Sequence, residues 1–380
     1  MILDYETLKL IWWALIGVLL IGFALTDGFD MGVGILLPII GKTDEERRIM
    51  LNTVGPHWEG NQVWLVTAGG ALFAAWPLVY AMAFSGFYLA MMITLFALFL
   101  RPVGFDYRSK LTNTSWRSGW DWGLFIGSAI PPVIFGVAFG NLLLGVPFHF
   151  DEFMRPTYTG TFFQLLNPFA LLAGIISLTM ITMHGAVWIQ MRTLDGLEGR
   201  ARSVAKLAAV ALVILFAIAG FWLNIGIDGF IIEHMPSANS AFTPDHKIVS
   251  QQAGAWLINY QLYPWMIIAP IAGFIGAISV YFCAEADRSG FAFIGSSLSL
   301  TGIVLTAGFS LFPFIMPSTT DLNSSLTVWD ATSSLLTLKI MFWVAVVFVP
   351  IIIVYSTWTY RKMWRRIDTH FIRSNQHTTY

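Results

Sequence analysis

The chain has 380 residues, of which 56% are hydrophobic and only 11% are charged, and its formal net charge is −1. In an average soluble domain about 25% of the residues are charged, so this composition excludes an ordinary soluble enzyme and a disordered chain. The near-zero net charge gives no general attraction for nucleic acid. The single cysteine, Cys283, excludes a disulfide framework and a cysteine-ligated metal cluster built from this chain alone. The composition therefore predicts a polytopic membrane protein.

Nine segments are long and apolar enough to be membrane-spanning helices, which need about 20 mostly apolar residues. They cover residues 8–36, 53–75, 79–100, 120–145, 163–190, 205–227, 263–284, 291–315 and 336–359. The second segment is the least apolar, because it opens with His57, Trp58 and Glu59. We therefore expect an all-α polytopic membrane protein in which residues 1–380 form a single integral-membrane domain with nine transmembrane helices.

The distribution of Lys and Arg predicts the topology. If all nine segments cross the membrane, 17 of the 21 basic residues fall on one side, and the other side keeps only Lys9, Arg155, Lys247 and Lys339. Cytoplasmic loops carry the excess of Lys and Arg. Without the crossing at 53–75, the basic clusters would be divided between the two sides. We therefore expect the N-terminus outside and the C-terminus in the cytoplasm.

Four carboxylates and one histidine are predicted at a similar depth in the membrane. Asp27 and Asp30 lie three residues apart near the inner end of the first helix and share one face of it. His57 and Glu59 open the second helix, and Asp106 follows the third. Ionisable groups inside a membrane are costly and usually functional. This arrangement suits proton uptake from the cytoplasm.

Structural interpretations stand beside that hypothesis. Asp27 and Asp30 also fit a role in holding the first helix against its neighbours. Asp106 also fits an ion pair with Arg101 or Arg108, which lie close to it in sequence. For these groups the sequence leaves both interpretations open.

Two histidines lie inside the predicted helices. His57 fits either a proton carrier or a hydrogen-bonded packing group. His184 could ligate a haem, but no second histidine lies at ligand spacing from it. We interpret His184 as a core histidine whose hydrogen bonds are satisfied.

Small residues and prolines predict how the helices pack. Gly69-Gly70-Ala71 and the Gly, Ala and Ser positions of the fourth and eighth helices are typical of close helix–helix contacts. Pro131-Pro132, Pro313 and Pro317 are expected to bend or end helices.

Several longer stretches form one pattern. They are Thr26–Gly32, His57–Trp64, Gly69–Pro77, Arg101–Arg108, Phe312–Ser318 and Ser325–Ser334. None is specific alone, but together they are. With this pattern the chain resembles subunit II of the cytochrome bd-type quinol oxidases over almost its whole length.

The resemblance implies a subunit of a terminal oxidase in the bacterial inner membrane that oxidises quinol, reduces dioxygen to water and takes protons from the cytoplasm. Two haems b and one haem d would belong to the larger subunit I, and this chain would hold no complete active site. The implied fold is two four-helix bundles plus one peripheral helix, with the N-terminus in the periplasm. The resemblance also allows for a structural quinone in this chain and for small single-helix accessory subunits.

The resemblance also assigns roles to single residues. Glu59 matches the acidic position of a proton path, with His57 beside it and Asp106 towards the entrance. Some members have Asp at the position of Glu59, and the longer side chain changes the geometry of a relay. Asp27 and Asp30 match an acidic motif of the family.

Two further expectations concern the gas substrate and the haems. Trp64 matches a position near the mouth of a dioxygen channel. With His57 and His184 as the only histidines inside predicted helices, the chain could not hold three haems by itself.

Two other functions compete with an oxidase subunit. A proton-coupled secondary transporter would use the same carboxylates and would explain the repeated Asp-Gly-Phe at 27–29 and 228–230. It would be favoured by broken helices at matched positions, but Pro131-Pro132 and Pro313 do not correspond. A structural scaffold, in which the polar groups only satisfy one another, is the third reading.

Overall fold

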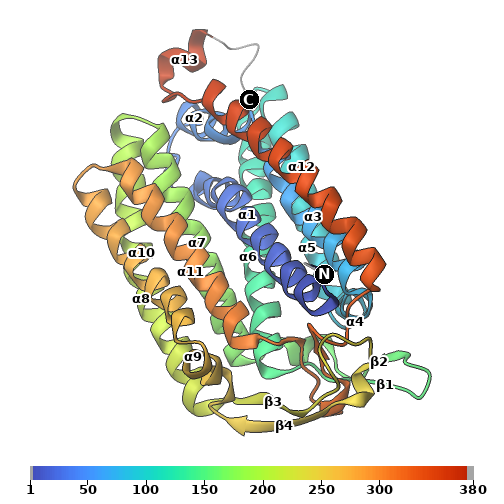
Figure 1. Ribbon diagram of the computed structural model, residues 1–380. Helices are drawn as coiled ribbons and strands as arrows, with labels where there is room; N and C mark the ends of the chain where they lie inside the picture. The colour runs from blue at the N-terminus through green and yellow to red at the C-terminus, as the bar shows by residue number, and fades with distance from the viewer. Residues whose placement is uncertain (1–2, 375–380) are drawn as a thin grey trace.

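The computed structural model describes residues 3–374 as long helices that run between two ends of the molecule (Figure 1). The long helices are α1 (Tyr5–Ile40), α3 (Trp58–Ala75), α5 (Tyr88–Tyr107), α6 (Thr114–Leu144), α7 (Pro168–Arg192), α8 (Asp195–Gly226), α10 (Ile268–Glu285), α11 (Ser289–Leu311) and α12 (Leu335–Lys362). The short helices are α2 (Asp44–Val54), α4 (Pro77–Gly86), α9 (Ile258–Leu262) and α13 (Thr369–Ser374).

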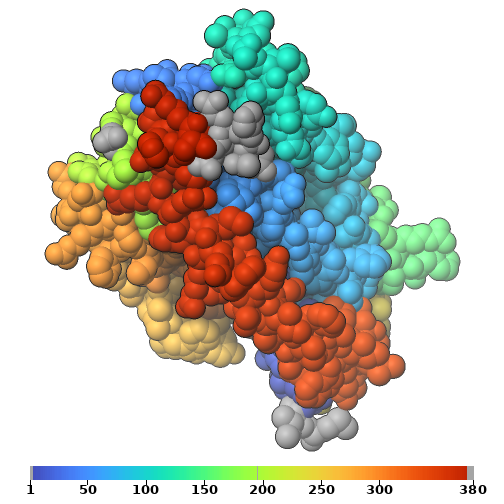
Figure 2. Space-filling view, turned by 90° about the horizontal axis from the view of Figure 1, so that it is seen from above, coloured from blue at the N-terminus to red at the C-terminus, as the bar shows by residue number. Residues whose placement is uncertain are grey.

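Three small antiparallel strand pairs lie at the end of the molecule that holds the N-terminus (Figure 1). They are β1 (Phe148–Phe150) with β2 (Pro156–Tyr158), β3 (Asp228–His234) with β4 (Ile248–Ala253), and β5 (Phe314–Met316) with β6 (Leu326–Thr327). The hairpin of β1 and β2 projects sideways from the body (Figures 1 and 2).

In the described part of the chain, eight helices are long and apolar enough to cross a membrane, namely α1, α5, α6, α7, α8, α10, α11 and α12. The helix α3 is not among them, because its first turns carry Glu59, Asn61 and Gln62. It nevertheless packs along α1. The fold is therefore that of a polytopic helical membrane protein, and the count of nine crossings stays a prediction.

Three predicted boundaries were wrong. The predicted helix 205–227 begins ten residues earlier, at Asp195, because α8 continues through the polar residues that precede its apolar part. Residues 53–57 do not belong to the second long helix, because Asp44–Val54 forms the separate helix α2, which a capping box of Thr43 and Glu46 begins. The predicted helix 79–100 is divided into α4 and α5 by a break at Phe87. The chain turns between α3 and α4 at Trp76, because Pro77 begins the helix α4.

The central helix is α1, which packs against α3, α6, α7 and α11. The sequential pairs α5–α6, α6–α7, α7–α8 and α10–α11 surround it, and α8 packs against α10. The helix α12 contacts only α1 and α3 to any extent and lies on the outside (Figure 2). The division into two four-helix bundles stays a prediction, while the outer position of the last helix agrees with it.

A close helix crossing joins α1 to α7. A Cβ atom added at Gly32 would lie 2.6 Å from Cα of Gly185 and 2.5 Å from the carbonyl oxygen of Ile181. Small residues of α6 and α11 also meet neighbouring backbones, as predicted. The prediction for Gly69 and Gly70 was wrong within this chain, because a Cβ at either position meets nothing within 4 Å.

The end that holds the strands contains a buried ion pair. Nζ of Lys247 lies 2.9 Å from Oδ2 of Asp330. Burial raises the pKa of Asp330 and lowers the pKa of Lys247, and the attraction between them partly offsets both shifts. Nearby, the buried Lys9 donates to the carbonyl oxygens of Ala238, Ser240 and Trp329. These contacts attach the N-terminal turn of α1 to the loops that cover this end.

The opposite end gathers the segments that carry the predicted cytoplasmic Lys and Arg residues, namely 42–48, 101–117, 192–206, 288 and 361–373 (Figure 1). Ion pairs connect them across helices. Arg202 lies 2.5 Å from Asp287, and Arg373 lies 2.7 Å from Glu45. The predicted segregation of the basic residues is confirmed.

We predict that Gly32→Ala destabilises the protein strongly, because the added methyl group would overlap the backbone of α7. Thermal unfolding of the purified protein measures the effect. Gly17→Ala on the same helix is the matched control, because a Cβ there meets nothing within 4 Å. Equal unfolding temperatures for the two variants would contradict this account of the α1–α7 crossing.

Candidate functional site

A buried ion pair connects α1 to α5. The guanidinium group of Arg101 donates two hydrogen bonds to the carboxylate of Asp27, at 2.8 and 2.6 Å. Both side chains are almost completely inaccessible to solvent. Such a two-point contact is the strongest arrangement of these groups. In this contact the two buried charges, that of Asp27 and that of Arg101, compensate each other.

Asp30, one turn further along α1, has no such partner. Its Oδ2 accepts a hydrogen bond from Nδ2 of Asn61 at 2.7 Å. Its Oδ1 is buried and accepts no hydrogen bond, and Nδ1 of His57 lies 3.9 Å from it. Among the described residues, no Lys or Arg side chain forms an ion pair with this carboxyl group, in contrast to that of Asp27.

Aromatic rings enclose the pair of Asp30 and His57. Phe29 stacks on Trp188 of α7 with ring centroids 3.9 Å apart. The ring of Tyr360, near the end of α12, lies 4.8 Å from the ring of His57. These contacts separate Asp30 from bulk water on the side of α7 and α12.

The structure brings three of the five predicted proton-path residues together, namely Asp27, Asp30 and His57. Glu59 is exposed on the outer side of α3 and forms no hydrogen bond or ion pair with the rest of the described chain. Asp106 is also exposed and lies at a surface hollow beside Lys110 and Trp116. The prediction that all five gather at one place is therefore not met within this chain.

The suggested ion pair of Asp106 with Arg101 or Arg108 was wrong. Arg101 is used by Asp27. Arg108 is completely buried and binds Asp121 of α6 at 2.5 Å, with Asp44 of α2 at 2.9 Å. Both arginines point into the protein, where each forms an ion pair with a buried carboxylate. Neither pairs with Asp106, which lies on the surface.

Glu59 lies on an exposed stripe of α3. The other exposed residues of this stripe are Gly60, Val63, Val66, Thr67, Gly70 and Phe73. The stripe is mostly apolar and includes two glycines. A Cβ added at either of these glycines, Gly60 or Gly70, or at the half-buried Gly69, meets nothing within 4 Å, so this side of α3 has room for a close neighbour from outside the chain.

Trp64 is half-buried between α3 and α1. Its indole ring covers Gly22, where an added Cβ would lie 2.7 Å from the ring. Leu20, Phe23 and Leu65, which are neighbours of these two residues in sequence, line a large cavity.

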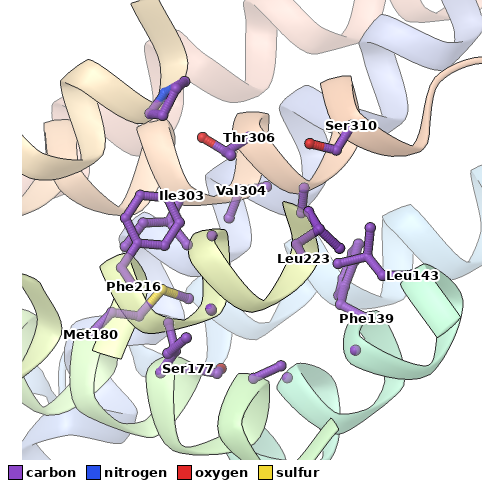
Figure 3. A pocket seen from close by; sticks show the side chains of 18 of the residues that line it. Phe139, Leu143, Ser177, Met180, Phe216, Leu223, Ile303, Val304, Thr306 and Ser310 are labelled. Carbon is purple, nitrogen blue, oxygen red and sulfur yellow. The ribbon is translucent and has the colours of Figure 1, made fainter. Parts of the chain in front are cut away.

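That cavity has a volume of about 940 Å³ and lies between α6, α7, α8 and α11 (Figure 3). Most of its lining is apolar, with Phe139, Met180 and Phe216 among the larger side chains. Its polar lining residues include Tyr260, Gln261, Thr306 and Ser310, while Ser177 lies on the opposite side from Thr306 and Ser310 (Figure 3). The hydroxyl groups of Tyr260 and Ser310 lie 3.2 Å apart.

His184 is a satisfied core histidine, as predicted. Its Nδ1 lies 2.7 Å from the hydroxyl oxygen of Ser296, and its Nε2 donates to the carbonyl oxygen of Leu25 at 3.0 Å. Both ring nitrogens are therefore occupied, so the residue does not fit haem ligation in this arrangement. Between residues 3 and 374, no cluster of three His, Cys, Asp or Glu side chains is placed to hold a metal ion.

Sequence reasoning missed three contributors to the site. Arg101 was considered only as a partner for Asp106. Asn61 could have been found, because it lies one turn after His57 and shares its face. Nothing in the sequence connects Tyr360 with the site, because it lies about 300 residues from Asn61. A tyrosine at the end of an apolar helix is also typical of a membrane boundary.

The chain matches the family model described as cytochrome bd terminal oxidase subunit II over residues 8–363. It is 56% identical to cytochrome bd-I ubiquinol oxidase subunit 2 of Escherichia coli (strain K12), over the full length of both chains. The chain belongs to the cytochrome bd terminal oxidase subunit II family.

Other comparisons agree with this family. The chain is 53% identical to a probable cytochrome oxidase subunit 2 of Haemophilus influenzae, over the full length of both. It is 33% identical to cytochrome bd ubiquinol oxidase subunit 2 of Bacillus subtilis, covering 94% of this chain and 96% of that one. In fold it is similar to a chain of the bd oxidase from Geobacillus thermodenitrificans, with a TM-score of 0.68, 14% sequence identity, and coverage of 93% and 98%.

Family membership makes this chain one subunit of a multi-subunit oxidoreductase complex and implies a partner subunit I. It also implies haem cofactors in that complex. With its many apolar helices, the subunit II chain is a multi-pass protein of the inner membrane.

We predict that Arg101→Leu costs about 3–5 kcal/mol of stability, because it leaves the Asp27 carboxylate buried without a partner. Unfolding of the purified complex measures the effect. Lys206→Gln, which removes an exposed ion pair with Glu285, is the control and should leave stability unchanged.

The double variant Asp27→Leu/Arg101→Leu should recover much of that loss, because it removes both buried charges together. If the double variant is less stable than Arg101→Leu, the pair does not act as a compensated unit.

Proposed function

We propose that this chain is the proton-handling and supporting subunit of a quinol:dioxygen oxidoreductase, a terminal oxidase of aerobic respiration. In this proposal the larger subunit I holds two haems b and a haem d, which supply the electron transfer and dioxygen chemistry. The present chain holds no complete active site. Its contribution is to deliver protons from the cytoplasm and to support the haem-bearing subunit.

The observation that carries the proposal is the contrast between two carboxyl groups on one helix. Asp27 is fixed by Arg101, whereas the buried Asp30 has one unpartnered oxygen and lies 3.9 Å from His57. A titratable group that is buried in a membrane protein without full compensation is a candidate for proton transfer. Asp30 and His57 are therefore assigned as the inner stage of the path.

Glu59 and Asp106 are assigned to the part of the path that subunit I completes. Glu59 lies on the exposed, glycine-containing stripe of α3, where a helix of subunit I would pack closely. Contact with subunit I would enclose Glu59 and exclude lipid from it. Asp106, exposed beside a surface hollow at the basic end, is assigned to the entrance.

The basic end is assigned to the cytoplasm and the N-terminus to the periplasm. The support is the segregation of Lys and Arg at one end of the structure, since cytoplasmic segments carry this excess. The proton path then opens on the cytoplasmic side. Small single-helix accessory subunits are a further proposed partner, and the exposed apolar helices leave surface for them.

The large apolar cavity is assigned to a structural quinone. Its volume of about 940 Å³ and apolar walls suit an isoprenoid chain, and Gln261, Tyr260 and Ser310 would hold the quinone head group. Leu20, Phe23 and Leu65 line the cavity, and Leu65 directly follows Trp64 in the sequence. This position of Trp64 supports dioxygen access past its side chain.

A proton-coupled transporter finds no support in the fold. The helix α6 runs unbroken through Pro131 and Pro132, and Pro313 comes after the end of α11. The described helices therefore lack a pair of breaks at matched positions, which an inverted-repeat transporter would show. Purification of the chain alone and without colour, in good yield, would favour the transporter.

We predict that Glu59→Gln lowers oxidase turnover by about tenfold or more while the complex still assembles with its haems. Glutamine keeps the size and polarity of the side chain but cannot carry a proton. Oxygen consumption with quinol as donor measures turnover, and the visible spectrum measures haem content. Glu152→Gln, on the exposed tip of the projecting hairpin, is the control. Unchanged turnover in Glu59→Gln would remove Glu59 from the path.

We predict that Gly220→Leu lowers the amount of quinone that copurifies with the complex. Gly220 lines the cavity, and a Cβ there meets nothing within 4 Å, so the new side chain can enter the cavity without distorting α8. Gly199→Leu on the same helix lies outside the cavity and is the control. Equal quinone in both variants, measured by extraction and chromatography, would contradict the assignment.

A further inference from the structure

The outer helix α12 is held firmly at the end nearest Asp30. Most of α12 is exposed, but the residues after it contact α7. The guanidinium group of Arg192 lies between the indole rings of Trp188 and Trp364, 4.9 and 4.8 Å from their centroids. It also donates to the carbonyl oxygen of Met363 at 3.1 Å. These contacts fix the last turn of α12, which includes Tyr360, over the candidate proton site.

Tyr360 is connected to Asp30 through one amide group. Its hydroxyl group donates a hydrogen bond to Oδ1 of Asn61. The Nδ2 group of the same amide donates to Oδ2 of Asp30 at 2.7 Å and lies 3.4 Å from Nδ1 of His57. Two helices far apart in sequence, α12 and α3, thus cooperate to place a donor on Asp30.

The polarity of this connection has a chemical consequence. An amide has a donor end and an acceptor end, so the hydrogen bond from Tyr360 to Oδ1 turns the NH₂ group of Asn61 towards Asp30. An NH₂ group can only donate, and it stabilises the ionised carboxylate. Without the tyrosine hydroxyl, the amide could turn over and present its oxygen to Asp30, which would stabilise the protonated carboxyl group.

We propose that Tyr360 is a positioning residue for Asp30, acting through the orientation of the Asn61 amide. The proposal rests on the proposed function, in which Asp30 carries protons. It gives the outer helix a second role beyond spanning the membrane, because the end of α12 completes the proton site.

The charged and titratable groups around Asp30 are few. Asp27 and its partner Arg101 approach from α1 and α5, His57 from the turn before α3, and Arg192 from α7 on the far side of His57. None of them contacts the Asn61 amide oxygen, which Tyr360 alone occupies among the described residues. Removing the hydroxyl group therefore changes the amide without removing a charge.

The test is infrared difference spectroscopy of the purified oxidase complex between its reduced and oxidised states. The carboxyl C=O band of Asp30 is identified by its loss in Asp30→Asn. In Tyr360→Phe we expect this band to shift and gain intensity, and turnover to fall by about fivefold, as for the loss of one hydrogen bond. Asn61→Leu, which removes the amide, should shift the same band. Tyr355→Phe, on the exposed side of α12, should change neither band nor turnover.

The possible outcomes separate this proposal from the proposed function. A wild-type Asp30 band in Tyr360→Phe, in a complex that retains its haems, would overturn the positioning role even if Asp30→Asn is inactive. Wild-type turnover in Asp30→Asn would overturn the proton-carrying role of Asp30. A shifted band in Tyr360→Phe would then still support the contact but not its function.

Discussion

The ion pair of Asp27 and Arg101 is the interaction on which the candidate site depends. It crosses from α1 to α5 in a region without solvent, and each partner would be strongly unfavourable without the other. Arg101 donates both of its hydrogen bonds to Asp27, so it makes no direct contact with the second carboxyl group on the same helix, that of Asp30. The pair therefore has two effects: it holds α1 against α5, and it leaves Asp30 without an arginine partner, which is the arrangement on which the proposed proton transfer at Asp30 rests.

The central position of α1 depends on how closely its neighbouring helices can pack against it. One face carries the two aspartates. In the same segment, Gly32 allows the backbone of α7 to come into contact with α1, and Gly28 leaves room for the side chain of Ile181. That contact brings Trp188 against Phe29 and Arg192 towards the end of α12. Larger residues at the glycine positions would move α7 away and open the site to water. The packing of α1 and the chemistry of its carboxyl groups are thus set by one short stretch of sequence.

The helix α3 has two different faces, and both bear on the function. Its inner face supplies Asn61 to Asp30, while its outer stripe presents Glu59 and Gly70 to whatever lies beside the chain. A polar side chain on an otherwise apolar outer stripe is stable in a membrane only if a partner or water reaches it. In the proposed path, Glu59 therefore does not reach Asp30 within this chain, and subunit I would complete the connection.

Much of the fold could be predicted from the sequence, because the length of an apolar segment indicates a helix and the distribution of Lys and Arg indicates the topology. Neither depends on which helices are neighbours. The contacts of the site could not. Arg101 lies at the end of an apolar run, which suggests a helix boundary, and only the approach of α5 to α1 shows that it turns inward to Asp27. Gly69 and Gly70 predict a close helix contact, but a glycine pattern does not reveal whether the neighbouring helix belongs to the same chain.

The most direct test of the account is proton uptake by the assembled oxidase in lipid vesicles during a single turnover, compared between the wild type and Asp30→Asn. The substitution keeps the size of the side chain and an acceptor for Asn61, and it leaves the pair of Asp27 and Arg101 intact. The account predicts uptake slowed by more than about tenfold in a complex with full haem content. Uptake at the wild-type rate would contradict the central claim that Asp30 carries the proton.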